Sequence, residues 1–273
     1  MKTIADTLEV SRANLNQKKS IPVARYNKSD DEWLLPLIRE IVAEKGSYGY
    51  RRVTARLCSL LEKQGKPRVN AKRIYRIMKA AGLLLQKHTG KPTQTHNGTI
   101  ITLKSNLRWC SDAFEIKCWS GEKVQVAFSL DCCDREAMSF VATTGGVTGE
   151  MIRDLMLEST EQRFGAGVSK LPHPLQWLSD NGPPYVATET REFGRRLGMI
   201  VCNTPSYSPE SNGMAEAFVK TFKRDYVYLN RLENARSVME QLPSWFEDYN
   251  ERAPHKGLKM RSPREFKRLN QAD

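Results

Sequence analysis

The sequence predicts an α/β fold, a mixed sheet with flanking helices, preceded by a small all-α domain of helix-turn-helix character. Apolar residues recur at helical spacing between residues 30 and 85, whereas after residue 105 they form the short alternating or continuous runs typical of strands. Charge divides the chain in the same way: residues 1–100 hold 20 of the 43 basic and 8 of the 31 acidic residues. The rest holds 23 of each, so the net charge of +12 belongs to the first part, as in a nucleic-acid-binding module joined to a neutral domain.

Three short helices are predicted in the first part, from the segments EWLLPLIREIVAEKG, YGYRRVTARLCSLLEKQG and NAKRIYRIMKAAG. The third has Asn70 as its N-cap and Gly82 as its stop. Its buried stripe consists of Ile74, Ile77, Met78 and Ala81. A basic last helix suits docking on duplex DNA, and the expected DNA-contacting residues of this region are Arg51, Arg52, Lys72, Arg73 and Arg76. The alternative is a solvated basic surface that only packs on its neighbours.

Two segments lack such periodicity. Residues 1–29 are too short to assign, and residues 86–105 are polar, with the Gly, Pro, Thr and Asn content typical of a linker. We therefore expect a helical DNA-binding domain at residues 30–85, an α/β core at residues 106–230 and a C-terminal helical extension at residues 231–273.

The α/β core begins with three strand-like segments, LRWCSDAFEI, KVQVAFSLDCC and AMSFVATT, separated by the turns SGE and DRE. Three antiparallel strands in meander order are the natural arrangement. Further strands are predicted at 174–180 and 199–203, and helices at about 148–164, 187–197, 209–229 and 235–250. The order βββαβαβα predicts a sheet with helices on its faces. Residues expected in the core include Trp109, Trp119 and Trp177.

The helix predicted at 209–229 belongs to the segment SPESNGMAEAFVKTFKRDY and the residues after it. Ser208 is its expected cap, and Pro209 suits the first helical position. Its apolar stripe consists of Ala215, Phe218, Val219, Phe222, Tyr226 and Leu229. Because that stripe should face the core, Glu216, Lys220 and Lys223 share another face and can meet one ligand. The alternative is an ordinary solvated face with Glu–Lys pairs.

Two aspartates occupy positions where α/β sheets collect functional groups. Asp180 closes the strand QWLSD, and the Pro-Pro-Tyr segment and helix after it disfavour a hairpin. Asp112 lies within the first strand, where a buried carboxylate needs a partner, a proton or a cation. Asp131 and Asp134 lie near another strand end and are alternatives to Asp112 on position alone.

Several motifs occur in one order along nearly the whole chain: YGYRRV, VNAKRIYRIMKAAGLL, RWCSD, LDCCDRE, SDNG, SPESNGMAEAFVKTFKRDY, and YNERAPH with RSPREF. With these motifs the sequence resembles the DDE transposase and retroviral-integrase superfamily, and most closely the second-frame (OrfB) transposases of bacterial two-frame insertion sequences. The resemblance implies an RNase H-like integrase core at residues 106–230. It also implies that the catalytic residues Asp112, Asp180 and Glu216 hold two Mg²⁺ ions, which Mn²⁺ can replace. Hard divalent cations do prefer carboxylate oxygens.

The resemblance further implies an enzyme, a DNA transposase that hydrolyses phosphodiesters at insertion-sequence ends and transfers the freed 3′-OH to another strand. Its partners would be double-stranded DNA, further copies of the chain, and the product of an upstream overlapping frame. The family's basic residue seven positions after the glutamate matches Lys223, while Lys220 follows from the helix phase alone. A catalytically silent DNA-binding regulator on the same scaffold is the alternative, and a nuclease with another substrate is a third reading.

The chain departs from the family pattern in two places. Pro183 and Pro184 stand where a small residue or Ser is usual after the DNG motif, which suggests a stiffer loop. The motif YNxxRPH has Ala253 in place of its arginine, although Arg252 is adjacent and His255 is kept. We expect His255 to have a structural role.

Composition excludes several other classes of protein. No apolar run reaches the length of a membrane span, and Asp6 and Glu9 lie where a signal peptide needs an apolar core. A cytoplasmic, nucleoid-associated location is therefore expected. The six cysteines show no C-x-x-C spacing, and we expect free thiols without zinc or disulfides.

Overall fold

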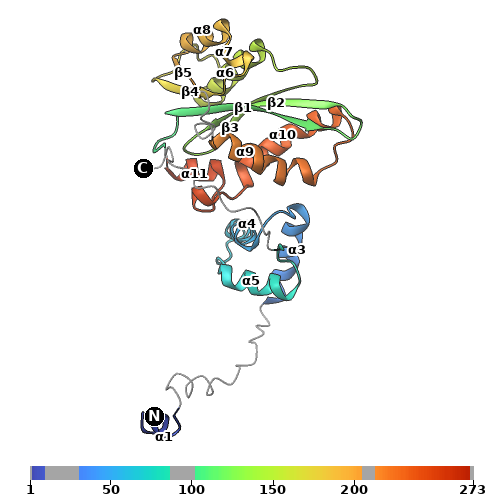
Figure 1. Ribbon diagram of the computed structural model, residues 1–273, viewed down its shortest axis with the longest axis vertical. Helices are drawn as coiled ribbons and strands as arrows, with labels where there is room; N and C mark the ends of the chain where they lie inside the picture. The colour runs from blue at the N-terminus through green and yellow to red at the C-terminus, as the bar shows by residue number, and fades with distance from the viewer. Residues whose placement is uncertain (1, 10–30, 87–101, 205–212, 271–273) are drawn as a thin grey trace.

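The computed structural model describes residues 2–9, 31–86, 102–204 and 213–270 (Figure 1). Its centre is a five-stranded sheet in the order β3-β2-β1-β4-β5. The strands are β1 (Arg108–Lys117), β2 (Lys123–Asp131), β3 (Ala137–Thr143), β4 (Leu175–Ser179) and β5 (Met199–Asn203). The first three pair antiparallel as the predicted meander, while β4 and β5 add in parallel beside β1. The predicted mixed sheet is confirmed.

The two predicted turns connect the meander. Gly121, in SGE, has a φ of 89°, which glycine adopts without steric cost. Arg135, in DRE, has a φ of 61°, an uncommon value for a residue with a Cβ. Both turns are short enough to return the chain directly into the neighbouring strand.

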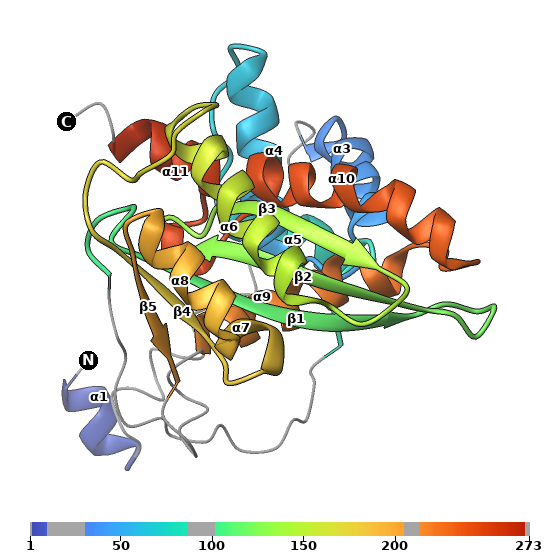
Figure 2. The same cartoon turned by 90° about the horizontal axis from the view of Figure 1, so that it is seen from above.

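Helices cover both faces of the sheet (Figures 1 and 2). One face packs against α6 (Gly149–Phe164), α7 (Pro183–Val186) and α8 (Thr188–Arg196). The other packs against α9 (Gly213–Asp225) and α10 (Ala235–Arg252), which share one apolar cluster with the meander. The remaining elements of this domain are η3 (Val227–Leu229), η4 (Lys256–Leu258) and α11 (Pro263–Asn270). The sheet and the helices on its two faces therefore form a three-layered domain.

Alternation along the strands decides which residues enter each layer. Trp109 and Trp177 are fully buried on the α6 face, with ring centroids 6.5 Å apart. Phe114 lies on the opposite face, 5.7 Å from the ring of Phe222 on α9. The prediction for Trp119 was wrong: the residue is 67% exposed because it follows the end of β1, where the chain has left the sheet.

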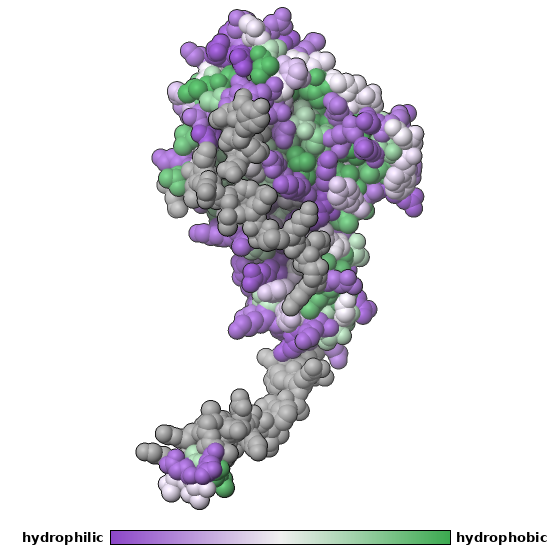
Figure 3. All heavy atoms as spheres, viewed as in Figure 1, coloured by the Kyte–Doolittle hydropathy of each residue, from purple (hydrophilic) through white to green (hydrophobic). Residues whose placement is uncertain are grey.

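The helical domain has a core of its own. Its helices are α3 (Leu34–Glu44), α4 (Tyr50–Lys63) and α5 (Ala71–Ala80), while α1 (Lys2–Thr7) precedes them. Asn70 caps α5 by accepting a 2.8 Å hydrogen bond from the Lys72 amide, and Gly82 ends it with a φ of 69°. Both signals had been predicted. Hydrophilic residues predominate on the face of this domain seen in Figure 3.

Two sequence expectations fall partly outside the described residues. The cap and first position of the helix at 209–229, Ser208 and Pro209, lie there, and the described helix α9 runs only from Gly213 to Asp225 before a 3-10 turn. Most of the linker at 86–105 lies there as well. Within the described ranges, no helix combines the length and apolar character needed to cross a membrane.

Candidate active site

Asp112 lies within β1, and Asp180 directly follows the end of β4, the parallel neighbour of β1. The pairing of Cys110 with Leu178, continued two residues along both chains, places the two aspartates side by side. Such strands are about 4.8 Å apart. Cys110 and Leu178 pack towards α9 and α10, and the two aspartates share their alternation, so both carboxyl groups belong to the α9 face. Both side chains are half-buried.

The loop after β4 holds Asp180 in place. The carboxyl oxygen Oδ1 of Asp180 accepts a 3.0 Å hydrogen bond from the Gly182 amide, and the side chain of Asn203 donates to the Asp180 carbonyl at 2.8 Å. A Cβ at Gly182 would lie 3.1 Å from Oδ1, which explains the glycine of the DNG motif. Pro183 and Pro184 then form the first turn of α7, where a missing N–H costs nothing. The predicted absence of a hairpin is confirmed.

Glu216 reaches the same face from α9. Phe218 packs on Phe128 of β2 with ring centroids 4.3 Å apart, which anchors the helix across the sheet. The Glu216 side chain is 44% exposed and lies 3.3 Å from the Lys220 ammonium. One turn further on, the Lys223 ammonium lies 5.7 Å from the ring centroid of Phe114. Glu216 and the two lysines therefore occupy the face that the helix phase had predicted.

The three acids influence one another electrostatically. Burial raises the pKa of Asp112 to about 6, against an accepted hydrogen bond from the Ala113 amide, and the charges of Asp180 and Glu216 raise it further. Repulsion of this kind is the reason for expecting a bound cation. In the ranges that the structure describes, no three His, Cys, Asp or Glu side chains are drawn together closely enough to hold one.

Replacing Asp112 with asparagine is expected to raise the melting temperature of the metal-free protein at about pH 7.5. The pKa of Asp112 is raised from 3.8 to about 6, so the folded state binds this proton more tightly than the unfolded state. Stability is then lost as pH rises from about 4 to about 6 and stays lost above. After solvent screening we expect roughly 1 kcal/mol, or about 2–4 °C in calorimetry.

The control for this prediction is Asp154→Asn, which neutralises an exposed carboxyl group on α6. At about pH 4 the Asp112 variant and the natural protein should melt at similar temperatures, because the carboxyl group is then protonated in the folded state. A variant that melts below the natural protein at pH 7.5 would contradict the proposed repulsion.

Asp131 and Asp134, the alternatives to Asp112, form ion pairs away from Asp180 and Glu216. Asp131 pairs with Trp109, and its Oδ2 accepts a 3.1 Å hydrogen bond from the indole of that residue. Asp131 therefore lies towards the α6 face, opposite to Asp112. Both alternatives contact the buried guanidinium of Arg163, Asp131 at 3.1 Å and Asp134 at 2.6 Å. Their environment is that of structural ion pairs.

The basic residues of the helical domain that were expected to contact DNA differ in their environments: some are exposed, and others are paired with carboxylates. Lys72 is exposed, and Arg51 is exposed with its Nε donating to the Tyr50 hydroxyl at 3.1 Å. Arg73 donates to Asp31 at 2.6 Å, and Arg76 donates to the same carboxylate. Arg52 points towards α9 instead, as described below.

The residues of the C-terminal motif are buried or paired with neighbouring side chains. Ala253 is fully buried, and Arg252 contacts Asp248 at 2.6 Å. The His255 ring lies 4.9 Å from that of Tyr249. Burial lowers the pKa of His255 to about 3, with the charge of Arg135 adding to the effect, so the imidazole is neutral at pH 7. A neutral buried imidazole agrees with the structural role expected for it.

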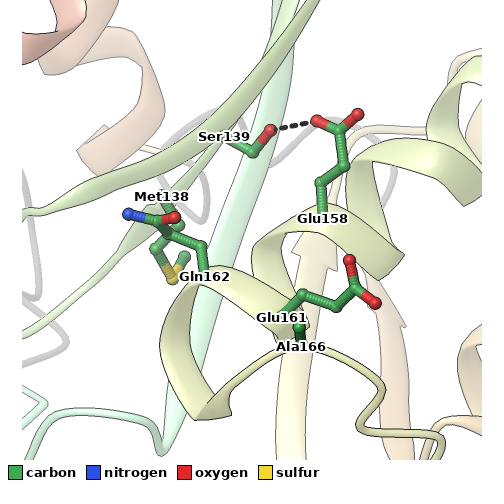
Figure 4. A pocket seen from close by; sticks show the side chains of 6 residues that line it. All are labelled: Met138, Ser139, Glu158, Glu161, Gln162 and Ala166. Carbon is green, nitrogen blue, oxygen red and sulfur yellow. Dashed lines mark hydrogen bonds between the residues drawn. The ribbon is translucent and has the colours of Figure 1, made fainter.

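An open hollow on the opposite face is separate from the acids (Figure 4). Glu158 accepts a 2.6 Å hydrogen bond from Ser139 at its rim, and the remaining lining residues are Met138, Glu161, Gln162 and Ala166. None of the three acids lines it. The acids lie instead on the face of the sheet that carries α9.

Family models agree with this architecture. Residues 28–91 match an HTH-like domain, and residues 103–209 and 197–263 match two integrase core domain models. The fold and the matches define an integrase-core protein with a helix-turn-helix-like domain, which is a protein of DNA recombination.

A similar protein shows to which family of integrase-core proteins the chain belongs. The chain is 44% identical to the transposase InsD for insertion element IS2A/D/F/H/I/K of Escherichia coli, over 97% of this chain and 90% of that protein. It belongs to the OrfB-type, second-frame transposases of bacterial insertion sequences, and DNA transposition is therefore its general function.

Solved structures with a similar arrangement include the simian T-cell lymphotropic virus intasome in complex with PP2A regulatory subunit B56 gamma. That likeness has a TM-score of 0.49 and 16% identity over 77% of this chain and 73% of that chain. The catalytic domain of Mos1 transposase, solved with Raltegravir and Mg, has a TM-score of 0.42 and 19% identity over 52% of this chain and 71% of that chain.

Proposed function

We propose that the chain catalyses metal-dependent hydrolysis and strand transfer of phosphodiesters at insertion-sequence ends, with Asp112, Asp180 and Glu216 as its catalytic residues. One observation carries the proposal. Asp112 lies on β1, Asp180 directly follows the neighbouring parallel strand β4, and Glu216 lies on α9, and the charges of Asp180 and Glu216 raise the pKa of Asp112. Three acids on one face without basic partners of equal number need a cation.

The donor chemistry suits two Mg²⁺ ions, or Mn²⁺ in their place, because all three side chains offer carboxylate oxygens. To hold the ions, the three carboxyl groups would have to move closer together than they lie in the described structure. Bound ions would supply stabilisation of the attacking and leaving oxygens of an in-line displacement. Asp112 and Asp180 would provide ligands from a rigid sheet, while Glu216 would complete the set from α9. The raised pKa of Asp112 means that its proton must leave before it can act as a ligand.

Lys220 and Lys223 are proposed to contact the DNA backbone beside the acids. They follow Glu216 on α9 by one and two turns, and the side chain of Lys220 is 79% exposed. Their ammonium groups offset the repulsion between the acids and a phosphate. DNA would then lie along α9, with the reacting phosphodiester near Glu216.

The test uses labelled duplexes that carry the ends of the element. With Mg²⁺ the protein should nick the end, leave a free 3′-OH and form a joined product, and a chelator should abolish both products. Duplexes with scrambled ends are the control. Specific binding without nicking under any divalent ion would contradict the proposal and favour the silent regulator.

We also propose that α5 contacts duplex DNA. Its exposed residues include Lys72 and Arg76, spaced four apart on one face. Arg76→Gln is expected to weaken binding to all duplexes alike and to reduce the slope of log K against log salt by about one, as for one lost phosphate contact. Asp31→Asn should instead strengthen DNA binding, because it removes the carboxylate that pairs with Arg76.

Arg68→Gln is the matched control for this prediction, since it removes an exposed arginine that pairs with Glu62 outside α5. Binding is measured by fluorescence anisotropy at several salt concentrations. If Arg76→Gln binds with the natural salt slope, α5 does not touch the DNA backbone.

The domain boundaries and the assembly remain part of this proposal. The helical domain at residues 30–85 would bind the element end, and the core at residues 106–230, with the extension at 231–273, would cut it. Two ends must meet for strand transfer, so we propose at least a dimer on DNA. An upstream frame would supply a further DNA-binding segment.

A further inference from the structure

The helical domain contacts α9 at a buried carboxylate, that of Asp225, which is the last residue of this helix. Ser47 donates a 2.6 Å hydrogen bond to Oδ1, and the Arg52 Nη2 donates to Oδ2 at 2.7 Å. Arg224, beside Asp225 in the chain, donates to both oxygens at 2.7 and 2.8 Å. The Asp225 side chain is fully buried, so all of its charge is balanced by these donors.

A second acid extends the contact. The Lys45 ammonium lies 3.0 Å from Asp248 of α10 and 3.7 Å from the ring centroid of Tyr226. The Tyr226 hydroxyl donates to Asp248 at 2.9 Å. On the helical-domain side, the Arg52 guanidinium stacks 3.8 Å from the ring centroid of Tyr48. We call this group the Asp225 junction, and its polar members are Lys45, Ser47, Arg52, Asp225 and Asp248.

Asp225 keeps its charge at neutral pH. Burial alone would raise the pKa of Asp225, but hydrogen bonds from Arg224 and Arg52 hold it well below its usual range. Because the unpaired charges would be costly in a dry interface, the two domains are held in one arrangement rather than many.

The same helix joins the junction to the proposed active site. Glu216 precedes Asp225 by nine residues, or about 13 Å along the helix axis. Between them, Phe218 and Phe222 are buried against the sheet and α10, so α9 cannot shift alone. The helix is a fixed spacer between the helical domain and the acids.

We propose that Asp225 is a positioning residue that sets which phosphodiester of the element end reaches the acids. This proposal rests on the proposed function, in which the helical domain binds the end and the core cuts it. The domain that binds DNA is anchored to the end of the helix that carries Glu216, so the separation of the two sites fixes the distance from the bound sequence to the cut.

The test is the distribution of cut positions on a labelled element end with the full chain and Mg²⁺. Asp225→Asn, which keeps the size of the side chain but loses its charge, should leave binding of the end within about twofold. Cutting at the natural position should fall about 10- to 100-fold, because a displacement of about 1 Å has such an effect, and cuts should spread to neighbouring phosphodiesters. Glu240→Gln is the matched control, since its pair with Arg236 on α10 is exposed.

The cut position separates positioning from folding. A partly unfolded variant cuts less but at the same phosphodiester, whereas a displaced helical domain changes the position. If Asp225→Asn does not fold, Ser47→Ala removes one donor and keeps the ion pairs, and it should give a smaller spread of the same kind. Natural cut positions in the folded variant would overturn the junction proposal alone, while absence of cutting by the natural chain would overturn the proposed function.

Discussion

Asp180→Asn is expected to lower Mg²⁺-dependent nicking of element ends by at least about 10³-fold, which corresponds to roughly 4 kcal/mol of lost transition-state stabilisation. The amide keeps an oxygen that can accept the hydrogen bond from Gly182, so the loop after β4 should retain its course. What it loses is the negative charge beside Asp112. Binding of duplex DNA should change by less than about twofold, because the helical domain is untouched.

Nicking rates on a labelled end and binding curves on the same duplex measure the two expectations separately. The matched control is Glu189→Gln, which removes an exposed carboxylate paired with Arg153 at the start of α8. The control should nick at the natural rate. If Asp180→Asn also nicks at the natural rate, this residue holds no metal and the proposed mechanism is wrong.

Arg163→Met is expected to destabilise the whole α/β domain by about 3–5 kcal/mol, through loss of a buried charge that balances several acids. The arginine side chain is 1% exposed and contacts Asp131, Asp134 and Glu136. Glu136 keeps Arg264 and Lys267 as partners, whereas the Asp134 carboxyl group is left with the Ser105 hydroxyl and the Glu136 amide. Thermal unfolding should show a melting temperature lower by roughly 6–20 °C.

The pH dependence of this variant gives a second check. Burial and the charge of Asp131 already raise the pKa of Asp134. Without Arg163, which lowers this pKa, Asp134 should bind a proton at a higher pH than in the natural protein. A protonated carboxyl group needs no counter-charge, so the difference in melting temperature between the variant and the natural protein should shrink as the pH is lowered. The exposed Arg236→Met is the control. An Arg163 variant that melts within 2 °C of the natural protein would show that the cluster is not balanced by this residue.

Local patterns were sufficient to predict most elements. The strands, the cap at Asn70 and the stop at Gly82 follow from side-chain spacing and backbone preference, which act over a few residues. The helix expected to continue to Leu229 instead ends at Asp225, whose carboxylate is bound by the helical domain. The sequence pattern contains no sign of a partner so far away along the chain.

The sequence predicted that the three acids lie near one another, but it did not predict their surroundings. Asp112 and Asp131 could not be separated by position alone, and only the strand register assigns them to opposite faces. Arg52 looked like a DNA contact because it is basic and stands in a basic segment, yet its partner is Asp225. The position of Asp225 beside the apolar stripe of α9 was the only signal in the sequence that this carboxylate would be buried and would need a cationic partner.

The pairing of β4 with β1 limits how this chain can vary in length. The three paired residues from Arg108 to Cys110 are enough to align Asp180 with Asp112. Residues added between α6 and β4 would lengthen a surface connection and leave both carboxylates where they are. A single residue gained or lost within Leu175–Ser179 would turn Asp180 towards the tryptophan side of the sheet. Length changes should therefore be tolerated in the connection and excluded from the strand.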